Sequence, residues 1–296
     1  MAEAKAIIYR KRPSNRRAGA TAALWLLACG LSGCTRPARL VEREGLTMGS
    51  TLHLTAWTRD EGAAQTAFDV VYAEFSRLDG LLSVWRAGSD VLKINAAAGD
   101  HPVPVDADVR EVLSLARQVS EWTNGAFDVT FGVLADIWKF DQDQDNSIPV
   151  PEAIRQRLPL IDYRAVAIDD RAGTVFLKRK GMRIHLGGIG KGYAVDRAVD
   201  ILRRRGIRDF LIQAGGDMYV GGRRDDRPWR IGIQDPRGPA NQSFASVDLS
   251  DSTFSTSGDY ERFFIKDEVR YHHILDLRTG QPARLRPVTR TSRRLR

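Results

Sequence analysis

Two glycine-rich segments bracket one predicted helix and supply main-chain groups that suit a phosphate or a cation. The first is residues 184–196 (IHLGGIGKGYAVD) and the second is residues 209–222 (DFLIQAGGDMYVGG). Glycine has no Cβ, so a strand can turn sharply into a helix and a ligand can approach the main chain. A helix that begins just after Gly187, Gly188 and Gly190 presents unpaired N–H groups and the positive end of its dipole. Glycine turns also join strands to helices for packing alone, so other segments must decide between the two interpretations.

His273 is the candidate for proton transfer. Imidazole takes up a proton near neutral pH, and Asp276 or a main-chain carbonyl would orient the ring. His272 provides a contrast, because adjacent strand residues point to opposite faces and only one of the pair should face a site. A Ser257–His273–Asp hydrolase triad is an alternative, although no G-x-S-x-G elbow surrounds the serine. We predict that His273 is a general base and that residues 257–259 line its cleft; a surface histidine without a role is the other possibility.

The charge of the chain is unevenly distributed. The 296 residues carry a formal net charge of +8, of which residues 1–33 supply +5 and residues 284–296 supply +6, so residues 34–283 carry −3. The body of the protein is therefore mildly acidic, and the basic total does not indicate a nucleic-acid partner.

The amino-terminal segment has the layout of a bacterial export signal. Five basic residues between positions 10 and 17 precede an apolar run at residues 18–31, which is too short to span a membrane. Residues 31–34 (LSGC) resemble a lipobox, which predicts that Cys34 is lipidated; an ordinary signal peptide is the alternative. We expect the lipid to anchor the protein at the periplasmic side of the inner membrane. Cys29 and Cys34 are the two cysteines of the chain, so the mature body should lack disulfides, Cys-based zinc sites and Cys nucleophiles.

Hydrophobic periodicity predicts the elements that position these residues. Apolar residues recur at three and four over residues 68–82, 109–119 and 194–202, which predicts three amphipathic helices. Strands are expected at residues 51–57, 210–213, 229–234 and 244–249, and a hairpin is expected to pair residues 174–177 with 183–186. Residues 141–146 (DQDQDN) resemble half a calcium loop but lack its Gly and Glu, so a solvated loop is expected.

Helices and hairpins interspersed in this way favour an α+β fold, a single mixed domain at residues 46–283 with amphipathic helices around a central sheet. A signal peptide at 1–33 and a linker at 34–45 would precede it, and an Arg-rich tail at 284–296 would follow.

Five separated segments together resemble the ApbE family, the FAD:protein FMN transferases. They are residues 47–51 (TMGST); 82–85 (LSVW); 124–128 (NGAFD) with 138–140 (WKF); 186–196 with 215–217 (GGD); and 255–260 (STSGDY) with 273–280 (HILDLRTG). The resemblance implies that the protein cleaves the pyrophosphate of FAD and attaches FMN to a Thr or Ser hydroxyl of an acceptor protein, releasing AMP. Such phosphoryl transfer needs positioning, Mg²⁺ to neutralise phosphate charge, and a base for the hydroxyl.

The resemblance also implies which residues of this chain contact FAD. They are Met48, Trp85, Ala126, Phe127, Asp128, His185, Lys191 and Ile274. A thioether and an indole suit a planar ring, the Asp128 carboxylate would accept from ribose or adenine, and Lys191 would suit a phosphate; core packing or a solvated first-turn lysine are the structural alternatives. The main-chain carbonyl of Gly188 aligns with a magnesium ligand, and His185 stands where many relatives carry Asp.

The resemblance stops at the carboxy-terminal tail. Relatives continue into a strand and an Ala-Asp-x-x-x-Thr-like motif that completes the magnesium site, whereas residues 284–296 read RLRPVTRTSRRLR. We expect this tail neither to fill the strand nor to supply anionic ligands. Two rivals to FMN transfer therefore stay open: an FAD-binding lipoprotein without transferase activity, and a metal-dependent FAD pyrophosphatase.

Overall fold

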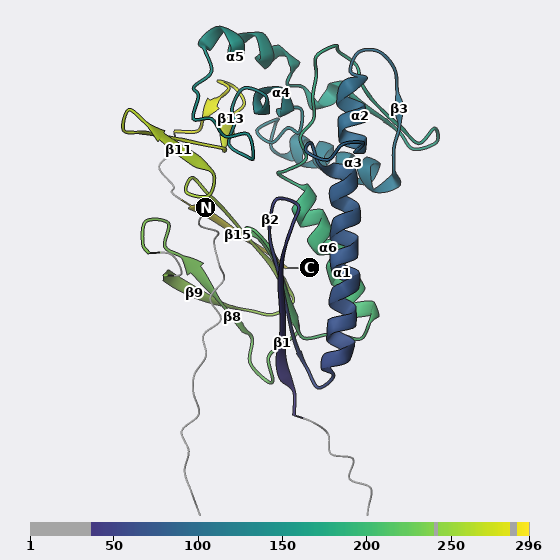
Figure 1. Ribbon diagram of the computed structural model, residues 1–296, viewed down its shortest axis with the longest axis vertical. Coiled ribbons are helices and arrows are strands. Elements are labelled where there is room, and N and C mark those ends of the chain that lie inside the picture. The colour runs from purple at the N-terminus through teal and green to yellow at the C-terminus, as the bar shows by residue number, and fades with distance from the viewer. Residues whose placement is uncertain (1–36, 240–241, 285–288, 296) are drawn as a thin grey trace, which may run out of the picture.

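A six-stranded antiparallel sheet forms the centre of the molecule (Figure 1). The computed structural model describes residues 37–239, 242–284 and 289–295. The order across the sheet is β1-β2-β6-β7-β10-β15. These strands are β1 (Arg39–Thr47), β2 (Ser50–Thr58), β6 (Phe210–Ala214), β7 (Asp217–Gly221), β10 (Ser252–Gly258) and β15 (Thr289–Leu295). The strands predicted at residues 51–57 and 210–213 are confirmed.

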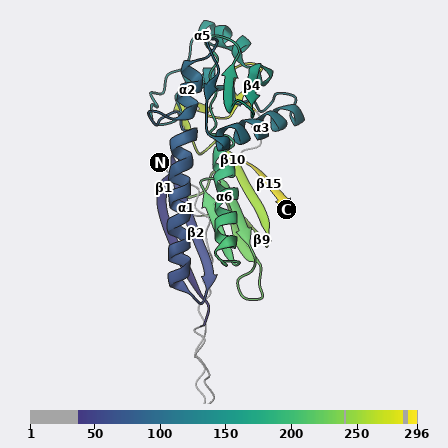
Figure 2. The same cartoon turned by 90° about the vertical axis from the view of Figure 1, so that its right-hand side faces the viewer.

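Two long helices cover one face of this sheet and lie side by side (Figures 1 and 2). They are α1 (Glu61–Leu82), which begins at the N-cap Asp60, and α6 (Gly190–Arg204). The predicted stripe of α1, which includes Phe68 and Phe75, is buried. Each such side chain stabilises the fold by about 1.5–3 kcal/mol. The helix pair is therefore a firm platform for the glycine-rich start of α6.

The opposite face of the sheet is covered by the hairpin of β8 (Trp229–Gln234) and β9 (Ser243–Leu249) (Figure 1). Trp229 and Ile231 pack with Met218 and Phe254 of the central sheet in a second apolar cluster. Both strands were predicted. The α+β expectation is thus confirmed, with amphipathic helices on one face and a hairpin on the other.

The remaining elements gather at one end of the sheet (Figure 1). The helical ones are α2 (Asp90–Ala96), α3 (Ala107–Trp122), α4 (Gly132–Ala135), α5 (Pro151–Arg157), and the short 3₁₀ turns η1 (Leu158–Leu160) and η2 (Tyr163–Ala165). The strands are β3 (Val103–Pro104), β4 (Val166–Asp169), β5 (Thr174–Leu177), β11 (Phe263–Lys266), β12 (Val269–His272), β13 (Leu275–Asp276) and β14 (Gln281–Pro282). Within the described ranges, no helix is long and apolar enough to cross a membrane.

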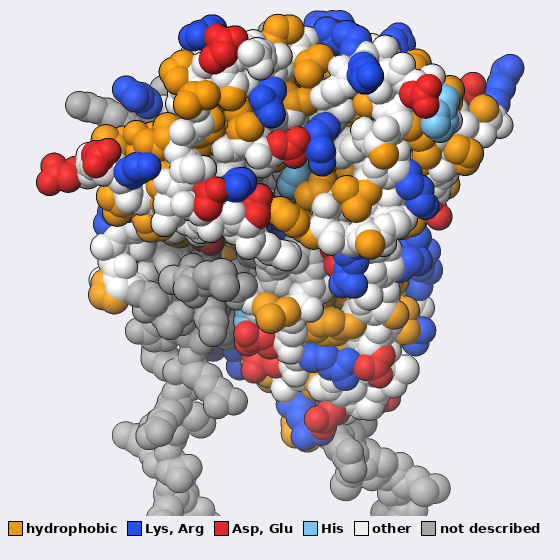
Figure 3. Space-filling model, turned by 45° about the horizontal axis from the view of Figure 1, so that its top comes forward, with side chains coloured by type: hydrophobic (Ala, Val, Ile, Leu, Met, Phe, Trp, Pro, Cys, Tyr) orange, Lys and Arg blue, Asp and Glu red, His pale blue; other side chains and the backbone are white. Residues whose placement is uncertain are grey.

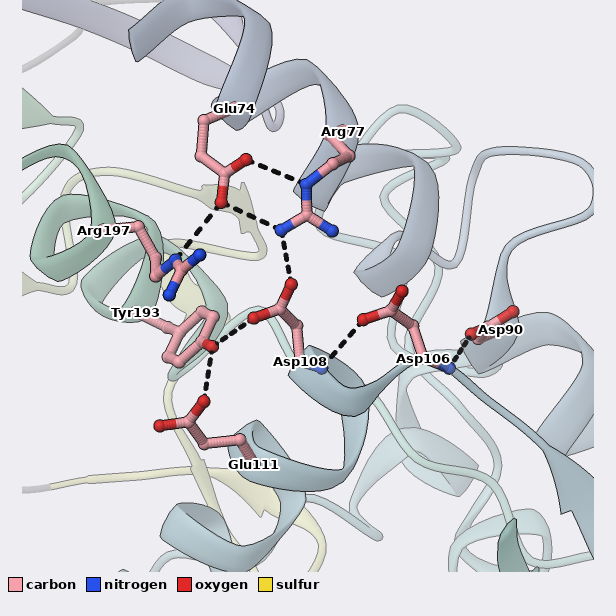
Figure 4. A network of polar contacts seen from close by, with 8 residues as sticks. All are labelled: Glu74, Arg77, Asp90, Asp106, Asp108, Glu111, Tyr193 and Arg197. Carbon is pink, nitrogen blue, oxygen red and sulfur yellow. Dashed lines mark hydrogen bonds and ion pairs between the residues drawn. The ribbon is translucent and has the colours of Figure 1, made fainter. Parts of the chain in front are cut away.

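A polar network joins α1, α3 and α6 (Figure 4). Arg77 of α1 pairs with Asp108 of α3, and Glu74 accepts hydrogen bonds from Arg77 at 2.8 Å and from Arg197 of α6 at 3.2 Å. The Tyr193 hydroxyl lies 2.5 Å from the Asp108 carboxylate. Burial and the adjacent carboxylates raise the pKa of Tyr193, so its hydroxyl stays protonated and donates. The network fixes the first turns of α6 relative to its neighbours.

Three expectations are wrong. Residues 183–186 do not pair with β5, whose partners are β3 and β4; they run beside residues 129–131 instead. Residues 39–45, expected as linker, form most of β1, because an edge strand needs few apolar residues when one neighbour supplies its ladder. Part of the Arg-rich tail pairs with β10 over seven positions as the edge strand β15, so it does fill a strand. Charged edge strands are common because they discourage further pairing.

Candidate functional site

Three turns meet at the amino end of α6. Gly215, which has a φ of +58°, donates its N–H to the Thr51 carbonyl at 3.0 Å. A Cβ added to Gly215 would lie 3.3 Å from Ser50 and 3.7 Å from Lys191, so this turn needs glycine. The structure thereby brings together three segments that the sequence pointed to separately: residues 47–51, the start of α6 and residues 215–217.

Met48 lies over the same helix start. It has a φ of +49° at the turn between β1 and β2, and it packs against the main apolar cluster. A Cβ added to Gly190 would lie 3.7 Å from the Met48 Cε atom and 3.5 Å from Leu82. Trp85 follows the end of α1 and is 46% exposed, which leaves much of its ring accessible to a ligand.

The loop before α6 is held by a side chain from α2. Asn95 accepts from the Ile184 N–H at 2.7 Å and donates to the Ile184 carbonyl at 3.0 Å. His185 donates its N–H to the Val129 carbonyl at 2.8 Å. These bonds replace the strand ladder that the predicted hairpin would have supplied. The sequence analysis missed Asn95, which is 89 positions from its partner.

His185 and Gly188 lie on this loop. The ring Nδ1 of His185 accepts from the Gly187 N–H at 3.1 Å, so a neutral ring carries its proton on Nε2. Burial lowers the pKa of His185, which favours that neutral form. Gly188 is exposed and lies against Phe127, whose ring would be 3.2 Å from an added Cβ.

Lys191 and Arg262 form the positive part of the site. The Lys191 Nζ atom donates to the Gly187 carbonyl at 3.3 Å, and no described residue forms an ion pair with it. Burial lowers the pKa of Lys191, with Asp217 opposing and Arg262 adding to the shift. Arg262 forms an ion pair with Asp141. The sequence analysis did not identify Arg262. Residues 141–146 form the expected loop, with residues 142–146 exposed, and Asp141 at its start pairs with Arg262.

His273 is oriented by a main-chain carbonyl. Its main-chain N–H donates to the Arg262 carbonyl at 3.1 Å, and its ring Nδ1 lies 3.3 Å from the same oxygen. With Nδ1 protonated, Nε2 is the basic atom. Burial, followed by the charge of Arg262, lowers the pKa of His273 to about 4. The expected orientation by a carbonyl is confirmed, whereas Asp276 pairs with Arg278.

His272 and Ser257 have other environments. The His272 ring is buried and lies 2.9 Å from the Ala283 carbonyl, which fits the expectation that the two histidines face opposite ways. Ser257 is exposed, and among the described residues it forms no hydrogen bond with His273, so the hydrolase triad is not formed. Ile274 is half-buried and accepts the Ala283 N–H at 2.9 Å.

An aromatic stack fixes the hairpin that leads into His273. Phe264 and Tyr271, on β11 and β12, stack at 5.2 Å, and Phe140 and Trp138 continue the stack. Trp138 also donates its Nε1–H to the Gly280 carbonyl at 2.7 Å. Such aromatic pairs contribute about 0.5–1.5 kcal/mol each beyond area burial. Residues 138–140 therefore hold in place the hairpin that leads into His273.

Asp128 holds its own loop, and its predicted contact with a nucleotide stays a prediction. Its carboxylate is buried and accepts from the Thr130 N–H and hydroxyl at 2.8 and 2.7 Å and from the Tyr163 N–H at 2.8 Å. Because both oxygens accept hydrogen bonds from residues 130 and 163, the carboxylate holds the loop in place. Ala126 is exposed and Phe127 half-buried on the surface of that loop.

The described side chains do not fit a complete magnesium site. Among them, no three His, Cys, Asp or Glu lie close enough together to hold a metal ion. Asp141 is engaged by Arg262, and the Asp217 Oδ1 atom accepts from the Ser255 hydroxyl at 3.1 Å. Mg²⁺ requires several oxygen ligands in near-octahedral geometry, so we derive no step through the ion.

These residues lie near one another at the end of the sheet where α6 begins. Figure 3 shows a hollow on this face with a histidine side chain inside it, bordered by hydrophobic, basic and acidic groups. Main-chain N–H groups at a helix start, two cations and two imidazoles whose neutral form is favoured make an arrangement that suits a phosphate-bearing ligand.

Comparisons with known proteins agree with this arrangement. The chain belongs to the ApbE family, whose model matches residues 48–292. It is 36% identical over 244 residues to an FAD:protein FMN transferase of Klebsiella pneumoniae, a match that covers 82% of this chain and 74% of that protein. It is 33% identical to the FAD:protein FMN transferase of Treponema pallidum, over 87% of this chain and 75% of the relative.

Two solved structures share the fold. The ApbE protein of Thermotoga maritima superposes with a TM-score of 0.78 at 34% identity, covering 86% of this chain and 81% of that one. The flavin transferase ApbE of Vibrio cholerae superposes with a TM-score of 0.77 at 28% identity, covering 87% and 82%.

Proposed function

We propose that this protein transfers FMN from FAD to a Thr or Ser hydroxyl of an acceptor protein. The observation that carries the proposal is the placement of His273 beside the cations: Arg262 and Asp141 act electrostatically on His185, Lys191 and His273 alike. A neutral imidazole and two cations therefore lie near the same ion pair of Arg262 and Asp141. The names of the relatives support FAD as the donor and a protein as the acceptor.

In the proposed reaction some residues bind FAD and His273 accepts a proton. Lys191 and the N–H groups at the start of α6 hold the pyrophosphate, and Met48 and Trp85 offer surfaces for the planar rings. The acceptor hydroxyl oxygen attacks the FMN phosphorus, the bond from that phosphorus to the bridging oxygen breaks, and AMP leaves with that oxygen. The hydroxyl proton passes to Nε2 of His273.

Magnesium belongs to the proposal through the family resemblance, with the Gly188 carbonyl as its expected main-chain ligand. When bound, the ion would neutralise phosphate charge. Two rivals stay open: an FAD binder without transferase activity and, with water in place of the acceptor hydroxyl, an FAD pyrophosphatase.

The test is intact mass spectrometry of an acceptor peptide after incubation with the full-length protein, FAD and Mg²⁺. A mass increase equal to FMN, with release of AMP, supports transfer; free FMN indicates pyrophosphatase, and retained FAD without AMP indicates a binder. His273→Gln should abolish labelling. The matched control His101→Gln changes a histidine that is 63% exposed and paired with Asp100, so it should leave labelling unchanged.

We also propose that lipidated Cys34 anchors the protein at the periplasmic side of the inner membrane. Cys34 and the signal segment lie outside the described residues, so the support is the sequence pattern alone. Labelling of cells with a radioactive fatty acid should mark the wild type but not Cys34→Ala, and equal labelling of both would refute the anchor.

A further inference from the structure

Arg262 contacts three segments that are far apart in the sequence. Its guanidinium forms an ion pair with Asp141 and donates to the Gly49 carbonyl at 3.4 Å. Its main-chain carbonyl accepts the His273 N–H at 3.1 Å and lies 3.3 Å from the ring Nδ1. Arg262 thus connects the turn between β1 and β2, the loop after Trp138 and the proposed base His273.

Two cations and two carboxylates act on one another around Arg262, and Asp217 is the carboxylate that acts on Lys191. Lys191 and the Arg262 guanidinium are two cations, and Asp141 is the carboxylate that neutralises Arg262 directly. The Arg262 side chain is 35% exposed and the Asp141 side chain 25% exposed, so a ligand can reach the pair. A guanidinium binds a phosphate at least as well as a carboxylate, because its fork fits two phosphate oxygens.

We propose that Arg262 couples substrate binding to the base: its guanidinium turns from Asp141 to the pyrophosphate of FAD while its carbonyl holds the His273 ring. This inference rests on the proposed function. Lys191 and Arg262 then bind the two phosphates together.

The coupling has an electrostatic consequence. The charged groups that act on the His273 ring are Arg262, Asp141 and His272, and the positive charge of Arg262 favours the neutral ring. A bound pyrophosphate offsets that positive charge, so the ring becomes a stronger base when FAD is present. The base is therefore strengthened when its substrate arrives.

Two variants break the same ion pair and test the proposal in opposite directions. Arg262→Gln removes the cation, so FAD should bind about 10–100-fold more weakly, as expected for one lost charge-assisted hydrogen bond. Asp141→Asn removes the competing anion, so FAD should bind at least as tightly as in the wild type. Arg262→Lys should restore part of the affinity, because it keeps the charge but not the fork.

The pH profile of kcat/KM separates this role from a merely structural one. Without the Arg262 charge the acid limb should move to higher pH, and without the Asp141 charge it should move to lower pH. Shifts in the same direction, or FAD binding by Arg262→Gln within about 2-fold of the wild type, would overturn the proposal.

The experiment uses the full-length protein. FAD affinity is measured by equilibrium dialysis, and thermal unfolding verifies that each variant is folded. If Arg262→Gln does not fold, Arg262→Lys and Asp141→Asn still decide: Asp141→Asn must not weaken FAD binding. If the wild type transfers no FMN, the proposed function fails, while the dialysis still tests whether Arg262 binds the pyrophosphate.

Discussion

Replacing Asn95 should disorder the loop that leads into the site. Asn95→Ala removes both hydrogen bonds to Ile184, at 2.7 and 3.0 Å, and leaves that residue's N–H and carbonyl without their partner. Ile184 is completely buried, so its main-chain groups are poorly placed to bond with water. Because Ile184 precedes His185, Gly187 and Gly188, loss of these hydrogen bonds should also displace residues that we expect to contact FAD.

The magnitude follows from the two orphaned groups. Leaving a buried donor or acceptor unsatisfied costs about 1–3 kcal/mol, so two groups give about 2–4 kcal/mol after some relaxation. Asn95 is itself half-buried, which allows a water molecule partial access and favours the lower half of that range.

Urea unfolding followed by tryptophan fluorescence measures the change. Asn95→Ala should lower the transition midpoint with little change in slope, and FAD affinity should fall with it. The control Gln118→Ala changes an exposed amide on α3 and should stay within about 0.5 kcal/mol of the wild type. If Asn95→Ala is as stable as this control, the side-chain clamp does not hold the loop and the reasoning is refuted.

Three further outcomes are expected. Gly132→Ala should destabilise the fold by about 1–3 kcal/mol in urea unfolding, since its Cβ would lie 2.7 Å from the Arg183 carbonyl oxygen. Gly80→Ala in α1 should instead stabilise the fold by about 0.5–1 kcal/mol, because its Cβ would have no described atom within 4 Å. Equal effects of the two substitutions would contradict this. Trp138→Phe should lose about 1–3 kcal/mol by the same measurement, because the Gly280 carbonyl loses its 2.7 Å donor. The unfolded chain binds a proton at an ordinary His pKa of 6.5 and the folded His273 only at about 4, so stability should fall as pH drops through that window. His273→Gln should flatten this part of the dependence, and an unchanged slope would show that the ring is not buried neutral.

Prediction from sequence was most accurate for the helices and strands whose own repeat of apolar residues identifies their buried face. The stripes of α1, α3 and α6 repeat every three or four residues, and the alternation in β2 repeats every two, so each element identifies its buried face without knowledge of its partner. The same reasoning found β6, β8 and β9.

Elements whose partners are distant or polar were predicted less well. Residues 183–186 have the composition of a strand, but their main-chain partners are the Asn95 side chain and residue 129, which no local pattern indicates. The edge strands β1 and β15 bond through their main chains and need few apolar side chains, so their polar sequences were assigned to a linker and a tail.

The candidate site shows the same division. Glycine turns and a histidine pair stand out from sequence because those residue types have few other uses at such positions, and the structure brings them together. Arg262 and Asp141, by contrast, are ordinary members of a chain in which 28% of residues are charged, and 121 positions separate them.

A charged residue becomes informative when the fold shows whether its charge is balanced. Lys191 has a carbonyl partner but no ion pair among the described residues, whereas Arg262 pairs with the carboxylate of Asp141. Burial lowers the pKa of Lys191 even though the Asp217 carboxylate acts on it, so holding this cation near Arg262 costs free energy that an anionic ligand would offset. A half-buried lysine without an ion pair among the described residues, near a partly exposed arginine, favours an anionic ligand, and a pyrophosphate between two nucleotide halves has the charge and the two phosphate groups to bind both cations.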